Sequence, residues 1–235
     1  MDRIRRSTLR GVGVGFGLMN LGLVVGLLSN IITFQVLGDF GQTAHGQWIS
    51  RRGLQYGFLI LAVGYIGYRS SVGLFVRIKR PSLEGLGWIL LGPVALIGIG
   101  LALDPVLEII GISMDHGAPT ADPTESLSQF AVFFIISWLV AAPAEELLFR
   151  GVIQGRLRET MQPVGAITVG AIIFALMHVL IGVIDGQSIG GIVAWGIETL
   201  VSGLLFGAAY ERTENLLIPS VIHATMWTLP YVILV

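Results

Sequence analysis

The chain has 235 residues, of which 54% are hydrophobic and only 12% are charged. A soluble domain carries about 25% charged residues, so this composition nearly excludes a soluble globular enzyme, and its apolar content also excludes a disordered chain. The absence of cysteine excludes disulfides and Cys-ligated metals, and a net charge of −1 gives no basic surface for nucleic acid. What remains is an all-α protein, a polytopic bundle of transmembrane helices.

Seven apolar stretches predict seven spans, within a range of six to eight, because a helix that crosses the hydrocarbon core needs about 20 apolar residues. In chain order they are residues 11–37, 53–68, 86–103, 127–149, 163–184, 190–210 and 216–235. Since no linker or charged run divides the chain, we expect one integral membrane domain over residues 1–235.

Basic residues gather at alternate ends of these spans, and they mark the cytoplasmic side of a membrane protein. All but two of the 14 Lys and Arg residues fall on the side of the N-terminus, the exceptions being Arg51 and Arg52. Residues 104–126 carry acidic residues and no Lys or Arg, as an outer loop does. We therefore predict a multi-pass protein of the cell membrane with a cytoplasmic N-terminus and an outer C-terminus.

Ionisable side chains inside lipid are costly and by default indicate function. The first cluster is Glu145, Glu146 and Arg150, at the end of the fourth predicted span. On a helix, Glu146 and Arg150 are four residues apart and share a face, whereas Glu145 is rotated by about 100°. This spacing predicts one neutralised carboxylate and one reactive base. The alternative is an interfacial cluster that anchors the helix end.

Three further ionisable residues, His178, Glu198 and His223, lie inside the fifth, sixth and seventh spans. A buried histidine taken alone is more often a hydrogen-bonded structural residue than a catalyst. Together, a carboxylate and two imidazoles can activate water and stabilise an oxyanion, although the same groups also match a common catalytic zinc set. Glu198 either pairs with a histidine or marks a polar pathway, and the sequence leaves both readings open.

The ionisable residues stand in three segments in series. These segments read Glu145-Glu146-Leu-Leu-Phe-Arg150, then Phe174-Ala-Leu-Met-His178, then a third region from Gly203 to His223. They resemble the CAAX-protease and bacteriocin-processing (CPBP) family of intramembrane glutamate endopeptidases over about residues 127–227. The resemblance implies a catalytic core in 127–235 and leaves accessory spans in 1–126. It also implies a mechanism without a metal. We expect a buried polar cavity that is open to the cytoplasm, and no cofactor.

The resemblance further implies a role for each matching residue. Glu145 is the general base that activates water, and His178 assists it. Glu146 and Arg150 shape the site, while His223 helps to hold the oxyanion of the tetrahedral intermediate.

One position departs from the family pattern. The family has an asparagine four residues after the histidine of the third motif, which is His223 in this chain. This chain has Trp227 at that position. Loss of one oxyanion donor costs about 10²–10³ in rate. Trp227 therefore indicates a slow enzyme, an enzyme with another donor, or a member without catalysis; Thr225 and Glu198 are polar groups that could substitute.

These observations predict an intramembrane endopeptidase of the CAAX-prenyl-protease type that hydrolyses a peptide bond with glutamate-activated water. Its partners would be membrane lipid and a peptide or protein substrate, prenylated or not, and no nucleic acid. Two alternatives stay open. One is a catalytically impaired member that acts as a membrane binding or immunity protein. The other is a proton-coupled transporter with a relay through Glu145, Glu198, His178 and His223.

The predicted spans place the site residues at unequal depths. Glu145 lies close to the basic cluster that follows span four, whereas His178 lies about 20 Å inside span five. The groups can meet only if the fourth helix continues past Arg150 within the protein, or if the fifth span begins outside the lipid.

Overall fold

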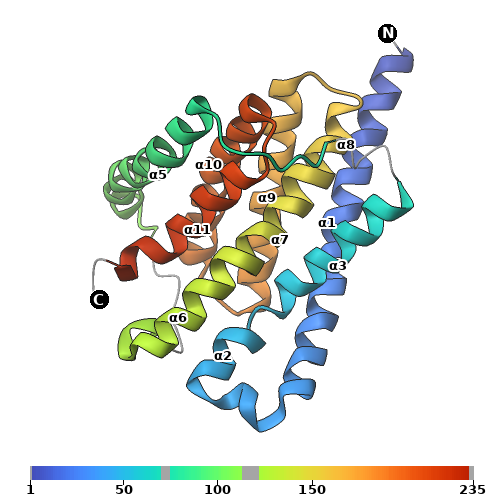
Figure 1. The fold of residues 1–235 in the computed structure, drawn as a ribbon. Helices are drawn as coiled ribbons and strands as arrows, with labels where there is room; N and C mark the ends of the chain where they lie inside the picture. The colour runs from blue at the N-terminus through green and yellow to red at the C-terminus, as the bar shows by residue number, and fades with distance from the viewer. Residues whose placement is uncertain (1, 70–74, 113–121, 233–235) are drawn as a thin grey trace.

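The computed structural model describes residues 2–69, 75–112 and 122–232 (Figure 1). Every regular element in these ranges is helical, which confirms the all-α prediction. Residues 113–121, at the centre of the predicted outer loop, and residues 233–235, at the end of the seventh predicted span, lie outside the described residues.

The N-terminal part of the chain forms a pair of adjacent helices. Helix α1 spans Asp2–Leu37 and helix α3 spans Gly53–Tyr68. A 3-10 turn, η1 (Gly38–Gln42), and a short helix, α2 (Ala44–Ser50), join them. Helix α1 begins before the predicted start of the first span at residue 11, since polar residues can continue a helix beyond the lipid.

Four more long helices lie to one side of this pair (Figure 1). Helix α5 spans Leu83–Ile109, which is longer than the predicted 86–103. Helix α9 spans Pro163–Ile184, α10 spans Ile189–Thr213 and α11 spans Leu217–Val232. The bounds of these three lie close to the predicted spans, because turn residues and polar residues interrupt the apolar runs there.

The fourth predicted span, 127–149, was wrong at its end, because the helix continues to Arg158. After a 3-10 turn, η2 (Pro123–Glu125), one unbroken helical run contains α-helical and π-helical turns in alternation. Its parts are α6 (Leu127–Ile136), η3 (Ser137–Ala141), α7 (Ala142–Glu146), η4 (Leu147–Gln154) and α8 (Gly155–Arg158). Arg150 and Arg156 are buried in this run and form ion pairs with Glu146 and Glu159. The charged residues from Arg150 onward therefore do not mark the membrane boundary. The predicted difference in depth between Glu145 and His178 disappears.

Five of the described helices are long and apolar enough to cross a membrane. They cover Arg6–Gln42, Leu83–Ile109, Leu127–Arg158, Pro163–Ile184 and Ile189–Thr213. Helices α3 and α11 form where spans were predicted, but each has 16 residues and is only about 24 Å long. Large apolar side chains on α5, such as Leu90 and Leu91, are exposed on the surface of the bundle. Their exposure fits a helix that is surrounded by lipid rather than water.

Helices α1 and α3 approach each other closely at small residues. A Cβ atom added at Gly57 would lie 2.5 Å from the Cα of Gly26, so nothing larger than glycine fits there. We expect Gly57→Ala to push the two helices apart and to lower the melting temperature, with a loss of about 1–3 kcal/mol from overpacking. The matched control is Gly64→Ala, since a Cβ at Gly64 on the same helix meets nothing within 4 Å. Thermal denaturation in detergent compares the two variants, and equal melting temperatures would contradict this packing.

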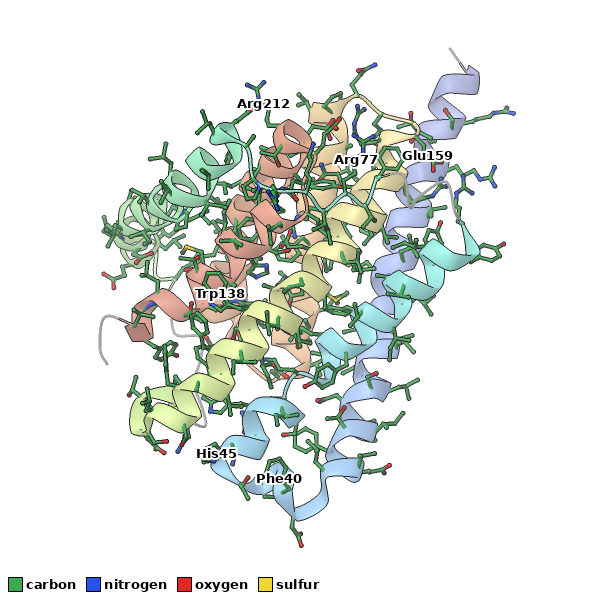
Figure 2. All side chains as sticks on the ribbon, in the orientation of Figure 1. Phe40, His45, Arg77, Trp138, Glu159 and Arg212 are labelled. Atoms are coloured by element: carbon green, nitrogen blue, oxygen red, sulfur yellow. The ribbon has the colours of Figure 1, made fainter. Side chains whose placement is uncertain are left out.

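The two ends of the bundle differ in charge. Figure 2 places Arg77, Glu159 and Arg212 at the end where the N-terminus lies, and Phe40 and His45 at the opposite end. We call these the basic end and the far end. The basic end is held by ion pairs between helices. They include Arg69–Glu159 at 3.0 Å, Arg158–Glu211 at 2.8 Å and Arg212–Glu84 at 3.5 Å.

The turn between α10 and α11 is fixed at the basic end. The Asn215 side chain donates to the Lys79 carbonyl at 2.8 Å and accepts from the Lys79 N–H at 3.2 Å. The Leu216 N–H donates to the Arg77 carbonyl at 2.8 Å. These bonds to the segment before α5 set where α11 begins, and therefore where His223 lies.

Candidate active site

Glu145 and Glu146 lie on the single α-helical turn, α7, between the two π-helical segments of the fourth membrane helix. Pro143 precedes them and has no N–H, so the ordinary helical hydrogen bond to residue 139 is absent. π-Helical turns of this kind are frequent at functional sites. They displace the side chains that follow relative to a regular α-helix, and here they precede and follow the two carboxylates.

Glu146 and Arg150 form the buried ion pair that their spacing predicts. The Glu146 side chain is fully buried, and Arg150 Nη1 donates to Glu146 Oε1 at 3.0 Å. Arg150 also donates to the Gly203 carbonyl at 3.4 Å, and its guanidinium lies over the ring of Phe174 at 4.3 Å from the centroid. This network joins the fourth membrane helix to α9 and α10.

His223 connects the two glutamates. Its Nδ1 lies 2.8 Å from Glu146 Oε1, and its Nε2 lies 3.9 Å from Glu145 Oε2. Because an ionised carboxylate can only accept a hydrogen bond, Nδ1 carries the proton in this contact. Its ring also stacks on Phe206 at 4.9 Å between centroids. Glu146 therefore orients His223, with Nε2 toward Glu145.

The two oxygens of Glu145 have different surroundings. The residue is 3% exposed, and its Oε1 accepts a hydrogen bond of 2.9 Å from Gln55 Nε2 on α3. Its Oε2 is buried and has no hydrogen-bond partner among the described residues. This oxygen can accept a hydrogen bond from a water molecule or a substrate.

His178 is held by its own helix. Its Nδ1 lies 2.8 Å from the carbonyl oxygen of Phe174, one turn earlier on α9. A carbonyl accepts but never donates, so Nδ1 carries a proton and a neutral ring offers Nε2 as a base. The ring packs between Phe174 and Trp195 at centroid distances of 4.4 and 5.0 Å, which fixes its orientation.

Glu145, His178 and His223 all line one cavity of about 710 Å³. Glu146 and Arg150 do not line it, so the five predicted site residues divide into three that reach the cavity and two that lie behind it. Most other lining side chains are apolar, and the main ones come from α5, α10 and α11. They include Leu96, Ile97, Leu101, Leu103, Val201, Phe206, Met226 and Pro230.

Residues 127–229 match the family model described as Rce1-like, type II CAAX prenyl endopeptidase Rce1-like. This segment belongs to the Rce1-like family. The resemblance found in the three motifs is thereby confirmed, and the protein is a membrane protein of the CAAX-protease type. No curated protein and no solved structure gives a significant match to the chain.

The Rce1-like segment does not contain every residue of the site. Gln55 and Arg52, on and before α3, also line the cavity and come from outside the matched region. The sequence analysis missed both as site residues, although signals were present. Arg52 is one of the two basic residues that do not fall on the side of the N-terminus. Gln55 is a polar residue inside an otherwise apolar span.

Trp227, the departure from the family pattern, packs directly against the site. Its ring lies 4.3 Å from that of His223, and the guanidinium carbon of Arg52 lies 5.2 Å from the Trp227 centroid. Burial lowers the pKa of Arg52, while the charge of Glu145 raises it; an arginine remains a cation even so. The Rce1-like site thus has a cation beside Trp227, on the cavity wall that includes Glu145.

Thr225 and Glu198, the two polar residues that the sequence analysis offered as substitutes, are poor replacements for an asparagine. The Thr225 hydroxyl donates to the Val221 carbonyl at 2.8 Å, and Thr225 does not line the cavity. Glu198 lines the cavity, but an ionised carboxylate has no proton to donate. Within the described ranges, no group of three or more His, Asp or Glu side chains is placed to hold a metal ion.

Proposed function

We propose that the protein is an intramembrane endopeptidase of the CAAX-prenyl-protease type that hydrolyses a peptide bond with water activated by Glu145. The observation that carries this proposal is the state of Glu145 Oε2. It is buried, lacks a hydrogen-bond partner among the described residues, and belongs to a residue that shares its cavity with two imidazoles.

In the proposed reaction, a water molecule lies between Glu145 Oε2 and His178 Nε2. Glu145 takes a proton from the water while the water oxygen bonds to the substrate carbonyl carbon. The electrons of the C=O double bond move to the oxygen and form an oxyanion. Glu145 then passes the proton to the amide nitrogen, and the oxyanion re-forms the C=O bond as the C–N bond breaks. The products are a carboxylic acid and an amine, and transfer of the acid's proton to the amine gives a carboxylate and an ammonium group. The reaction requires no metal or cofactor.

His223 and Arg52 stabilise the oxyanion in this proposal. A protonated His223 can donate from both ring nitrogens, and its Nδ1 is already bonded to Glu146. Arg52 replaces the amide that the family takes from asparagine, since a guanidinium offers five N–H donors and a positive charge. Glu146 and Arg150 are positioning residues that hold His223.

The role of Arg52 predicts a large loss of rate on substitution. We expect Arg52→Gln to slow peptide cleavage by about 10²–10³, the usual cost of removing one oxyanion donor. Arg52→Lys should keep part of the rate, because it retains the charge. The matched control is Arg51→Gln, an exposed neighbour, which should cleave at the wild-type rate.

A second substitution distinguishes this role from a structural one. Adding Trp227→Asn to Arg52→Gln restores the family's donor and should recover much of the lost kcat. If Arg52→Gln cleaves as fast as the wild type, or if the double variant recovers melting temperature but no rate, Arg52 is not the donor.

The proposed activity can be tested with a panel of peptides. Protein in lipid nanodiscs is incubated with a farnesylated C-a-a-X peptide, the same peptide without lipid, and peptides from membrane-protein loops. We expect at least one peptide to be cut, and its new carboxylate to contain oxygen from isotopically labelled water. Saturable binding of a peptide without any cleavage would contradict the proposal and favour the noncatalytic membrane binding protein.

The proposal includes a metal-free reaction. We expect purified protein to contain far less than one zinc ion per chain, and cleavage to be unchanged by a chelator. Elemental analysis measures the first and the peptide assay measures the second. Stoichiometric zinc that is lost together with activity would show that Glu145 and the two histidines serve a metal ion instead.

A further inference from the structure

Three buried oxygen atoms on residues that line the cavity have no hydrogen-bond partner among the described residues. They are Glu145 Oε2, Gln55 Oε1 and Asp104 Oδ1. All three are acceptors, and no described lining residue has a buried side-chain donor atom without a partner. Because buried polar groups are nearly always hydrogen-bonded, a ligand that fits this cavity brings hydrogen-bond donors.

Asp104 is the one of these three residues that the proposed reaction does not use. Glu145 is the general base, and Gln55 binds the other oxygen of Glu145. Asp104 lies on α5, where Leu101 and Leu103 also line the cavity. A carboxylate without a partner costs free energy among apolar side chains. That cost is offset when a ligand brings the opposite charge.

The charges on the cavity wall favour the same kind of ligand. Among the described residues that line it, three have a carboxylate, namely Asp104, Glu145 and Glu198. One has a guanidinium, namely Arg52, and this group lies over the ring of Trp227. Carboxylates therefore outnumber guanidinium groups by two, and a concave surface with a surplus of negative charge attracts cations.

We propose that Asp104 binds the lysine or arginine side chain of a peptide substrate. This inference rests on the proposed function and narrows its substrate class to apolar peptide segments that carry a cationic residue. The ammonium or guanidinium group donates to Asp104 Oδ1, while apolar side chains of the peptide contact Leu96 and Ile97 on the same helix. Asp104 takes no part in the chemical step, so it determines specificity.

Contacts between α5 and α11 show which part of α5 lies beside the catalytic residues. A Cβ atom added at Gly85 would lie 3.0 Å from Ile218, and one added at Gly92 would lie 3.0 Å from Ile222. The two helices therefore run side by side in the same direction. Since Ile222 directly precedes His223, Gly92 marks the level of the catalytic site on α5.

The position of Asp104 predicts where the cation stands in the substrate. Asp104 follows Gly92 by 12 residues, which is about 18 Å along a helix. An extended peptide covers this distance with about five residues, and the long side chain of lysine covers part of it. We therefore expect the cationic residue about three to five positions from the bond that is cleaved.

The proposal is tested by binding of matched peptides to the full-length protein. The probes are fluorescent apolar peptides with blocked ends and one variable position, which is lysine, norleucine or glutamate. Norleucine has an aliphatic side chain without the amine of lysine. Fluorescence anisotropy measures binding to protein in nanodiscs of phosphatidylcholine, which has no net charge, and empty nanodiscs measure partition into lipid. We expect the lysine peptide to bind about 10-fold to 100-fold more tightly than the norleucine peptide, and the glutamate peptide to bind least.

Two substitutions at Asp104 assign the preference to this residue. Asp104→Asn should bind the lysine and norleucine peptides equally, and Asp104→Lys should prefer glutamate. The matched control is Glu108→Gln, which removes an exposed acidic residue of the same helix and should keep the lysine preference. The melting temperature of Asp104→Asn should not fall, because the substitution removes a charge that has no partner.

Equal binding of lysine and norleucine peptides to the wild type would overturn the proposal, as would a lysine preference that persists in Asp104→Asn. Loss of all peptide binding together with a lower melting temperature in both Asp104 variants would show a structural residue and would also overturn it. Binding is measured without cleavage, so the outcomes are separable. A protein that prefers lysine but cuts no peptide would keep this inference and contradict the proposed hydrolysis.

Discussion

Glu145→Gln is expected to abolish peptide cleavage while the protein still folds and inserts. The amide has the same shape as the carboxylate, but it cannot accept a proton from water. General-base catalysis contributes about 10²–10⁴ in rate, and we expect a loss of at least this size in kcat. The measurement is the rate of product formation from a peptide that the wild type cleaves, together with the melting temperature of both proteins.

The matched control for this variant is Glu198→Gln. Glu198 lines the same cavity and has no role in the proposed reaction, so its amide should cleave at nearly the wild-type rate. Cleavage by Glu145→Gln at the wild-type rate would contradict the mechanism. If Glu198→Gln lost cleavage while Glu145→Gln kept it, Glu145 would not be the general base. A proton relay through Glu198 would then be the better account.

Arg150→Met is expected to destabilise the protein strongly. It leaves the Glu146 carboxylate fully buried without its guanidinium partner, and breaking a buried ion pair costs about 3–5 kcal/mol. The same substitution removes the cation that lies over Phe174. Thermal denaturation in detergent should show a large fall in the melting temperature. Peptide cleavage should fall because Glu146, the partner of His223, is no longer held by Arg150.

A double variant separates stability from catalysis at this pair. Glu146→Gln combined with Arg150→Met removes both charges, so no uncompensated charge stays buried and much of the stability should return. Cleavage should remain low, since a neutral amide holds the His223 imidazole less strongly than a carboxylate does. An unchanged melting temperature for Arg150→Met, or full activity of the double variant, would contradict the roles of Glu146 and Arg150.

Much of the site could be predicted because its residues are unusual in an apolar chain. The four-residue spacing of Glu146 and Arg150 predicts their pairing, and this pair is present at 3.0 Å. His178 and His223 were identified because ionisable groups inside lipid are costly. The contact between His223 and Glu146 could not be predicted, since it depends on how α11 packs against the fourth helix.

The end of the fourth helix was misjudged for a physical reason. Charged residues usually mark the membrane boundary, so Arg150 was expected at the interface. Here Arg150 and Arg156 are buried and paired with Glu146 and Glu159, and the helix continues to Arg158. Ion pairing in the protein interior replaces the water that these groups would otherwise need.

The contribution of α3 escaped the sequence analysis because it depends on tertiary packing. Gln55 reaches Glu145 across 90 positions of sequence, and the close approach of α1 and α3 at Gly26 and Gly57 supports that helix. No motif includes these residues. The Rce1-like match also begins well after them, at residue 127.

The most direct test of the account is the position of one water molecule in an experimental structure of the protein in lipid, at a resolution that shows ordered water. The account predicts a water within about 2.7–3.2 Å of both Glu145 Oε2 and His178 Nε2. A side chain bonded directly to Glu145 Oε2, or a separation from His178 Nε2 greater than about two hydrogen-bond lengths, would contradict it.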